Sequence, residues 1–528
     1  MENQNYYSNK NPENRLQDSI KLSLSLRKKK LNQKLCESHT LINPNLSKDE
    51  EESNNVSKLC ELSKILVAQK DNQNIINTLD KLYFFLINIK IPLKANFIKL
   101  SNIIPNLYNT IQFFERNEIV LLKIYDALEE IIKYFYYYEN DDNCFGMFND
   151  QYFQLIYRLI DLYQNNDNIM KKIFNFLSDL IKKSDFTKEY LMTKPGCYFI
   201  QSILSLDNLY TTNIIQILSS FCNYENLCDE KMKDFEIMFI QECGKILTLF
   251  YHENLTDPKI VINNNNLFKN LYSCFSFISI SELNEVKNKF FIDDKKYNVN
   301  LLEKIMEFEK LDRENLAGKV LRILVNLFCS SDKRHIQILI ENKSYQYVMD
   351  RLVDKFSDEN IIKEASTALS NFVNTEIFRK IFIENKYIND IINKLRENKS
   401  YEITKELLCV ISNIIFSIEE EKIFSLIDSD LIPFCVEFLM TIKEPYLLIY
   451  LLKIIELILF KGDPNVYVDC YHKNADDKIL NPFKYRFDTY GLYDILSNIL
   501  TNNKNENVCN SIKSILEHYY DQNQIIDE

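Results

Sequence analysis

Two apolar stretches with the same pattern decide the fold of this chain: IKEASTALSNFV (Ile362–Val373) and TKELLCVISNII (Thr404–Ile415). Each has a Lys-Glu pair at its second and third residues, continues as an apolar run and reaches a Ser-Asn pair near its end. The apolar residues recur at the three- and four-residue spacing of one helix face. Two such helices, about 42 residues apart, predict a chain built from helical repeats.

The same register continues outside these two stretches. Asn326 lies one period before Asn371, and Asn413 lies one period after it. Upstream, polar residues mark the same frame: Glu130, Asp179 and Ser220. A period of about 40–47 residues with two or three helices is typical of armadillo and HEAT repeats, which stack into one continuous core. The sequence therefore predicts an all-α fold, a right-handed α-solenoid of about ten armadillo repeats with a flexible basic N-terminal tail.

The composition narrows the possible partners. The 528 residues are 46% hydrophobic and include only 6 Gly, which argues against a large sheet protein with many tight turns. The net charge of −12 argues against an overall nucleic-acid binder and favours basic partners. The longest apolar run, Tyr446–Phe460, carries two charges and is too short to span a bilayer. We therefore expect neither a nucleic-acid nor a membrane partner.

Patterns of catalytic and cofactor sites are missing from the sequence. The glycines form no phosphate loop, and the five His lack the spacing of metal ligands. The 13 Cys are scattered without a C-x-x-C pair, which is typical of free thiols in a reducing compartment. We expect no enzymatic activity, no cofactor and no metal, and a location in the cytoplasm and nucleus.

Several segments flank or interrupt the repeats. Residues 1–45 hold eight Lys and Arg against two acidic residues between positions 10 and 34, which predicts a basic segment with helical potential or, alternatively, a solvated tail. We expect an acidic linker over 46–58, the solenoid over 59–522 and a tail over 523–528. Within the solenoid, the highly charged stretch 272–314 breaks the period and is predicted to be a loop insertion.

Taken together, these pieces resemble importin-α, the adaptor family that carries nuclear-localisation signals. Residues Ile362–Leu395 look like the seventh armadillo repeat of that family, and Thr404–Leu439 look like the eighth. GLYDILSNILTNNKNENVCNSIKSILEHYY (Gly491–Tyr520) resembles the short terminal repeat, and SLRKKKLNQKL (Ser25–Leu35) resembles the importin-β-binding segment. The order and spacing of these stretches carry the resemblance.

The resemblance implies a concave groove that binds basic nuclear-localisation-signal peptides. In the family, the third helix of each repeat carries Trp and, one turn later, Asn; the Asn amide holds the peptide backbone and the Trp faces flank lysine stems. The matching residues of the C-terminal groove are Asn326, Asn371, Asn413, Glu364, Glu406 and Arg322, with Thr367 and Cys409 at Trp positions. A degenerate N-terminal groove is implied at Asp126, Glu130, Asp179 and Ser220.

The resemblance also implies the partners. The importin-β-binding-like residues are Arg27, Lys28, Lys29, Lys30 and Lys34. We therefore expect an importin-β-like transport receptor, basic cargo peptides and, at the C-terminal repeats, an export factor. The implied function is an adaptor that links cargo to importin-β for nuclear import. The alternative, favoured by the absence of Trp, is an armadillo-repeat protein-interaction scaffold outside nuclear transport.

Overall fold

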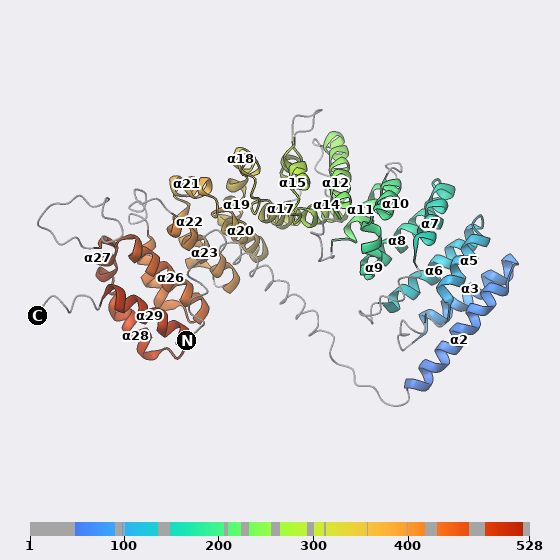
Figure 1. Cartoon of the computed structure of the whole chain (residues 1–528), viewed down its shortest axis with the longest axis horizontal. Coiled ribbons are helices and arrows are strands. Elements are labelled where there is room, and N and C mark those ends of the chain that lie inside the picture. Colours follow the sequence, from blue (N-terminus) through green and yellow to red (C-terminus); the bar gives the residue numbers. More distant parts are fainter. Residues whose placement is uncertain are drawn as a thin grey trace, which may run out of the picture. The chain divides into compact units, whose positions relative to one another are not determined.

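The structure is a computed structural model of the chain, and it divides into two compact units. It describes residues 48–89, 98, 101–135, 148–204, 210–222, 232–254, 265–292, 300–310, 313–355, 357–398, 400–417, 430–463 and 481–520. The described elements are 25 α-helices (Figure 1). The expected basic segment 1–45 and the tail 523–528 lie outside the described residues.

The first unit comprises Met1–Phe114 and Lys133–Cys144. Its main helices are α2 (Lys48–Ala68), α3 (Asn72–Ile87) and α5 (Ile103–Phe113), and α2 packs against both of the others. The expected acidic linker over 46–58 is wrong from residue 48 onward, because this stretch forms the first turns of α2. Carboxylates are favourable near a helix N-terminus, where the backbone N–H groups carry partial positive charge.

The second unit comprises Glu115–Ile132 and Phe145–Glu528, and it repeats a pattern of a first, a second and a third helix. The complete triplets are α9 (Asp185–Met192), α10 (Lys194–Leu204) and α11 (Thr211–Ser219); α15 (Asn284–Phe291), α16 (Leu301–Glu309) and α17 (Arg313–Leu327); α18 (Lys333–Glu341), α19 (Ser344–Val353) and α20 (Glu359–Phe372); α21 (Glu376–Glu384), α22 (Tyr387–Glu397) and α23 (Tyr401–Ser417); and α27 (Pro482–Thr489), α28 (Leu492–Asn502) and α29 (Glu506–Tyr519). Repeats with two described helices are α7 (Asp150–Tyr163) and α8 (Asp167–Lys183), α12 (Lys233–Asn254) and α14 (Asn265–Ile278), and α25 (Leu431–Thr441) and α26 (Pro445–Lys461).

The third helices form a ladder through this unit. Each third helix from α8 to α26 packs against the next one, in the order α8, α11, α14, α17, α20, α23, α26 and α29. Helix α6 (Glu118–Phe135) continues the ladder at its N-terminal end, where Tyr125 meets Phe176 of α8 edge to face at 5.6 Å. Buried apolar residues recur along these helices at helical spacing, as Leu369 and Phe372 do in α20. The predicted all-α solenoid is therefore confirmed. We call the solvent-facing side of this ladder the third-helix face.

A recurring tight turn fixes the register between first and second helices. The residue before the second helix has a positive φ in three repeats of this unit: 52° at Lys343, 57° at Lys386 and 72° at Gly491. This left-handed conformation suits glycine and costs a side-chain-bearing residue about 1–2 kcal/mol. The repeat geometry therefore imposes the same backbone on different residues, which is independent support for the period.

The predicted loop insertion over 272–314 is wrong. Its first residues end the third helix α14, and its later ones form α15, α16 and the start of α17. The Tyr272 hydroxyl donates to the backbone oxygen of Ile305 at 2.6 Å, which joins two of these helices in the core. Glu309, which contributes to the charged appearance of the stretch, is fully buried and pairs with Arg351 of the following repeat at 2.9 Å. The prediction was wrong because it took the charges of this stretch to be solvent-exposed, whereas Glu309 is buried and paired.

Candidate functional site

Three asparagines occupy the same place on consecutive third helices. Asn326, Asn371 and Asn413 lie near the ends of α17, α20 and α23, and all three are half-buried. Each amide nitrogen donates to the preceding repeat or its edge. The acceptors, in order, are Ser276 O at 3.2 Å with Ser279 Oγ at 2.8 Å, Val325 O at 3.0 Å, and Asn374 Oδ1 at 3.1 Å.

These hydrogen bonds use the amide nitrogen of each asparagine and not its carbonyl oxygen. A side-chain amide has two N–H donors and a carbonyl acceptor. Within the described part of the chain, no hydrogen bond reaches the Oδ1 atoms of Asn326, Asn371 or Asn413. The amide nitrogen therefore orients each side chain against the neighbouring repeat, and the oxygen can still accept an N–H from a bound peptide.

The carboxylates beside these asparagines already have partners. Glu364 Oε1 accepts from Arg322 Nε at 2.8 Å, and the arginine side chain is 61% exposed. Glu406 holds the equivalent place on α23, is buried, and accepts from Ser370 Oγ at 3.0 Å. An exposed ion pair is worth about 0–1 kcal/mol, so a competing cation can open the first of these contacts at small cost. The Glu406 carboxylate, in contrast, is buried.

In the expected N-terminal groove, Lys172 lies between two carboxylates, Asp126 and Glu129, and we call these three residues the N-terminal acidic site. Lys172 Nζ of α8 lies 2.5 Å from Asp126 Oδ1 and 3.1 Å from Glu129 Oε2, both on α6. Burial raises the pKa of Glu129, and the hydrogen bond from Lys172 offsets this rise only in part. The sequence reasoning missed Glu129, although it lies three residues after Asp126 and hence on the same helix face.

Of the other residues expected in the N-terminal groove, Asp179 and Glu130 are half-buried, whereas Ser220 lies in the core. Asp179 lies on α8 and pairs with Lys182 of the same helix at 3.8 Å. Glu130 is half-buried on α6. Ser220 is only 1% exposed, and its hydroxyl bonds to Ser178 Oγ at 2.8 Å. It is therefore a core residue, whereas the sequence analysis predicted a groove residue. The N-terminal acidic site is thus Asp126, Glu129 and the lysine between them.

Cations lie between the two acidic regions of the ladder. Lys319 of α17 is half-buried and donates to Ser273 Oγ of α14 at 2.6 Å. Burial lowers the pKa of Lys319, and the positive charges of Arg322 and Lys269 lower it further. Along the ladder, carboxylates on α6 are therefore followed by cations on α14 and α17 and by carboxylates again on α20 and α23.

Two tyrosines of α26 lie at or near Cys409, one of the positions where the resemblance implies a tryptophan. Thr367 is buried, but Cys409, at the next Trp position, is half-buried beside Tyr450 of α26. Burial raises the pKa of Tyr450 to about 12, and Cys409, Tyr401 and Glu406 add to the rise. Tyr446, one turn before Tyr450, is 68% exposed. The sequence signal that could have revealed this group is the four-residue spacing of Tyr446 and Tyr450 on one helix.

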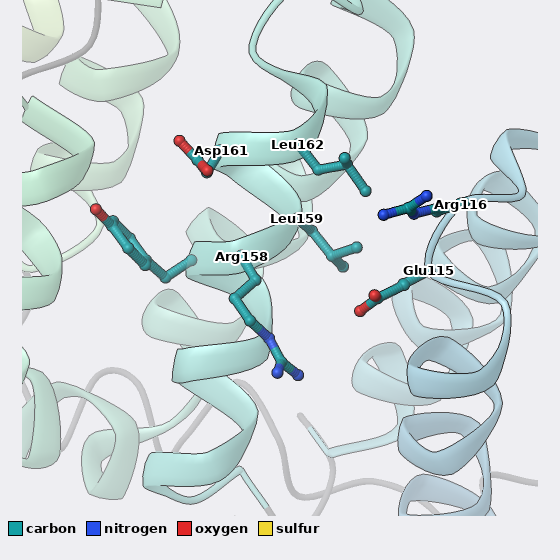
Figure 2. Close-up of a pocket in the computed structure, with 7 residues that line it drawn as sticks. Glu115, Arg116, Arg158, Leu159, Asp161 and Leu162 are labelled. Atoms are coloured by element: carbon teal, nitrogen blue, oxygen red, sulfur yellow. The ribbon is translucent and has the colours of Figure 1, made fainter.

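A separate hollow of about 250 Å³ lies beside α7 (Figure 2). Figure 2 shows Glu115 and Arg116 facing Leu159 and Leu162, with Arg158 on the same side of α7. The remaining lining residues are Tyr157 and Asp161. Two arginines balance two carboxylates here, and none of the expected site residues contributes to the lining. The hollow therefore gives no support to a specific ligand.

Among the residues that the structure describes, none of the helices combines the length and the apolar character that crossing a bilayer requires. The same residues bring together no group of three or more His, Cys, Asp and Glu that could hold a metal ion. The candidate site is accordingly the third-helix face, with its asparagines, carboxylates and tyrosines.

Comparisons with known proteins bear on the fold. No protein-family profile and no curated protein sequence matches this chain. The crystal structure of an engineered protein is 14% identical with a TM-score of 0.60, over 88% of this chain and 98% of that one. A structure from work on a phosphorylation switch that controls the interaction between cadherin and beta-catenin is 11% identical with a TM-score of 0.51, over 87% of this chain and 85% of that one. A designed armadillo repeat protein in complex with the peptide (KR)4 is 20% identical with a TM-score of 0.38, over 53% and 98%. At these identities the likeness shows the fold alone: the chain is an all-α solenoid of the armadillo-repeat type.

Proposed function

We propose that this chain is a peptide-binding solenoid whose third-helix face holds an extended basic segment, and that it acts as an importin-α-like adaptor for nuclear import. One observation carries the proposal: Asn326, Asn371 and Asn413 stand one repeat apart with their amide nitrogens anchored and their amide oxygens available. This is an ordered row of acceptors for the N–H groups of a peptide backbone.

The spacing of the row suits an extended peptide. Packed helices lie about 8–10 Å apart, and an extended chain rises about 3.3 Å per residue. Successive asparagines would therefore meet N–H groups two to three residues apart. Each bond would contribute about 0.5–1.5 kcal/mol, so that affinity requires several asparagines to act together.

Charge favours a basic peptide. The chain carries a net charge of −12, and carboxylates lie on α6, at the N-terminal end of the third-helix ladder, and on α20, near its middle. A peptide cation would exchange with Arg322 at Glu364 or with Lys172 at Asp126. In the adaptor role, the chain would work in the cytoplasm and nucleus without enzymatic activity, and it would use residues 1–45 to bind an importin-β-like receptor.

Titration of a labelled lysine-rich peptide tests the binding face. Asn413→Ala should weaken binding about threefold to tenfold, because it removes one acceptor of the row. Asn385→Ala is the matched control, since Asn385 is exposed at the end of the first helix α21 and its amide nitrogen donates to Ile381 O of the same helix. Thermal unfolding of each variant would separate lost binding from lost folding. Equal affinities for the two variants would contradict the role of the asparagine row.

A pulldown of importin-β tests the adaptor role. The whole chain should capture the receptor, and a chain lacking residues 1–45 should not. Failure of the whole chain to capture it would exclude the adaptor role and leave peptide binding intact.

That result would favour a second candidate, an interaction scaffold outside nuclear transport. The observation in its favour is that Lys172 and Arg322 already neutralise carboxylates of the face, which weakens an ordinary site for lysine-rich signals.

A further inference from the structure

We propose that Cys222 and Cys274 form an oxidation site, a reversible disulfide that joins two consecutive repeats of the second unit and stabilises their packing. The two Sγ atoms lie 4.0 Å apart, although 52 residues separate them in the sequence. Oxidation would link the turn after α11 to the interior of α14. The inference is independent of the proposed function, since it needs neither a bound peptide nor an importin-β-like receptor.

The two cysteines differ in their access to solvent. Cys222 is half-buried and lies in the turn that follows α11, where its backbone N–H donates to Ser219 O at 3.1 Å. Cys274 lies within α14 and is fully buried. Helices α11 and α14 pack against each other, so the contact crosses the junction between two repeats. Cys222 is therefore the thiol that a small oxidant can reach, and Cys274 is the buried thiol next to it.

A small side-chain movement suffices to form the bond. A disulfide has an S–S distance of about 2.05 Å, so the two sulfurs must approach by about 2 Å. Rotation of a cysteine side chain between staggered rotamers gives movements of this size. The thiol of Cys222 also contacts Leu218 O, but at 4.0 Å this contact is weak. Rotating the Cys222 side chain therefore costs little and breaks no backbone hydrogen bond of α11.

A lysine from the next repeat influences both thiols. Lys319 Nζ of α17 donates to the Oγ atom of Ser273, the residue before Cys274, at 2.6 Å. The contact with Cys274, and then burial, raise the pKa of Cys222, and burial raises the pKa of Cys274. The positive charge of Lys319 opposes both rises. Because the thiolate is the reactive form, the pair should stay reduced during a brief exposure to oxidant and oxidise slowly under a sustained one.

The oxidant class is a small disulfide such as glutathione disulfide. Cys222 loses its proton to solvent, and its sulfur attacks one sulfur of the oxidant; the S–S bond of the oxidant breaks, and one small thiolate leaves with the bonding electrons. Cys274 then loses its proton and attacks Cys222 Sγ, which releases the second small thiolate. The cysteine pair is thereby oxidised by two electrons, and the oxidant is reduced to two thiols. An excess of the small thiol reverses both steps.

The test maps the disulfide in the whole chain. The protein is incubated with glutathione disulfide, the remaining thiols are blocked with N-ethylmaleimide, and the digest is analysed by mass spectrometry without reduction. We expect a linked pair of peptides that contain Cys222 and Cys274, which dithiothreitol separates. Cys222→Ser should lose this link. Cys329→Ser is the control, because it removes an exposed thiol just after α17 and leaves the pair intact.

Thermal unfolding tests the effect on packing. The oxidised wild type should melt about 2–8 °C above the reduced protein, because a cross-link restricts the unfolded chain. Cys329→Ser should show the same rise, and Cys222→Ser should show none.

Three outcomes would overturn the proposal. Recovery of Cys222 and Cys274 from the wild type as separate maleimide or glutathione adducts would refute the disulfide, whatever the folding of the variants. A link from Cys274 to Cys243, which is buried on the neighbouring helix α12, would refute the role of Cys222. An unchanged melting temperature after the link has formed would refute the stabilisation of the two repeats.

Discussion

Replacing Lys172 with methionine should strengthen the binding of a basic peptide to the N-terminal acidic site. The lysine Nζ lies 2.5 Å from Asp126 and 3.1 Å from Glu129. Two charges about 3 Å apart attract by roughly 5 kcal/mol at an effective dielectric constant of 20. The three side chains are 22–37% exposed, so solvent reduces the net worth of both pairs together to about 1–2 kcal/mol. A peptide cation must now offset this free energy to reach the carboxylates.

The assay is fluorescence anisotropy with a lysine-rich peptide at several salt concentrations. We expect Lys172→Met to bind about fivefold to tenfold more tightly than its control at low salt, because 1.4 kcal/mol corresponds to a factor of ten. The difference should shrink as salt screens the exposed carboxylates. The same variant should lower the free energy of unfolding by about 1 kcal/mol, since Asp126 and Glu129 would then repel each other.

Lys171→Met is the matched control. Lys171 neighbours Lys172 in sequence but is 61% exposed and pairs only loosely with Asp167, at 3.9 Å. Both variants change the net charge equally, so long-range attraction of the peptide changes equally in both. Equal peptide affinities for the two variants, or weaker binding by Lys172→Met, would refute the reasoning that an internal lysine competes with the ligand.

Three further predictions concern stability, each measured by urea denaturation. Gly491→Ala should cost about 1 kcal/mol, because its φ of 72° disfavours a side chain although the space around it is open, whereas Gly318→Ala, inside α17 and equally open, should stabilise by about 0.5–1 kcal/mol. Arg351→Met should cost about 3–5 kcal/mol because it removes the ion pair of the fully buried Glu309 with Arg351, and adding Glu309→Gln should recover much of the loss. Burial lowers the pKa of His335, so its stabilising contribution is complete above its ordinary pKa of 6.5 and is lost as the pH falls below it; the His335→Gln variant should lack this step.

The repeat period was accessible to sequence reasoning because it depends on local chemistry. Apolar residues at helical spacing, with Asn371 and Asn413 in a common frame, were sufficient to predict third helices that stack. The stretch 272–314 was misjudged because sequence patterns treat charge as exposure. Glu309 is buried there with a partner 42 residues away, and nothing local to either residue announces the pair.

The chemistry of the candidate site was less accessible, since it depends on which atoms are already engaged. The sequence correctly placed Asn371 on a third helix. It could not show that the amide nitrogen of Asn371 donates a hydrogen bond to the backbone oxygen of Val325 in the preceding repeat, 46 residues away. Likewise, Lys171 and Lys172 are the same residue type side by side. Only the orientation of α8 toward α6 separates a solvated charge from one that fills an acidic site.

The junction of α23 and α26 shows why a repeat-by-repeat comparison underestimates the site. Judged alone, the α23 repeat lacks its aromatic wall, because Cys409 stands at the Trp position. In the folded chain, Tyr450 of α26 lies beside that cysteine, and Tyr446, one turn earlier on α26, is exposed. The same holds for Glu364 with Arg322 and for Asp126 with Lys172, which join neighbouring third helices. Under the proposed function, the peptide affinity of this face depends on contacts between repeats as well as on the asparagines, so substitution of a residue that is paired across a junction, such as Lys172, should change that affinity.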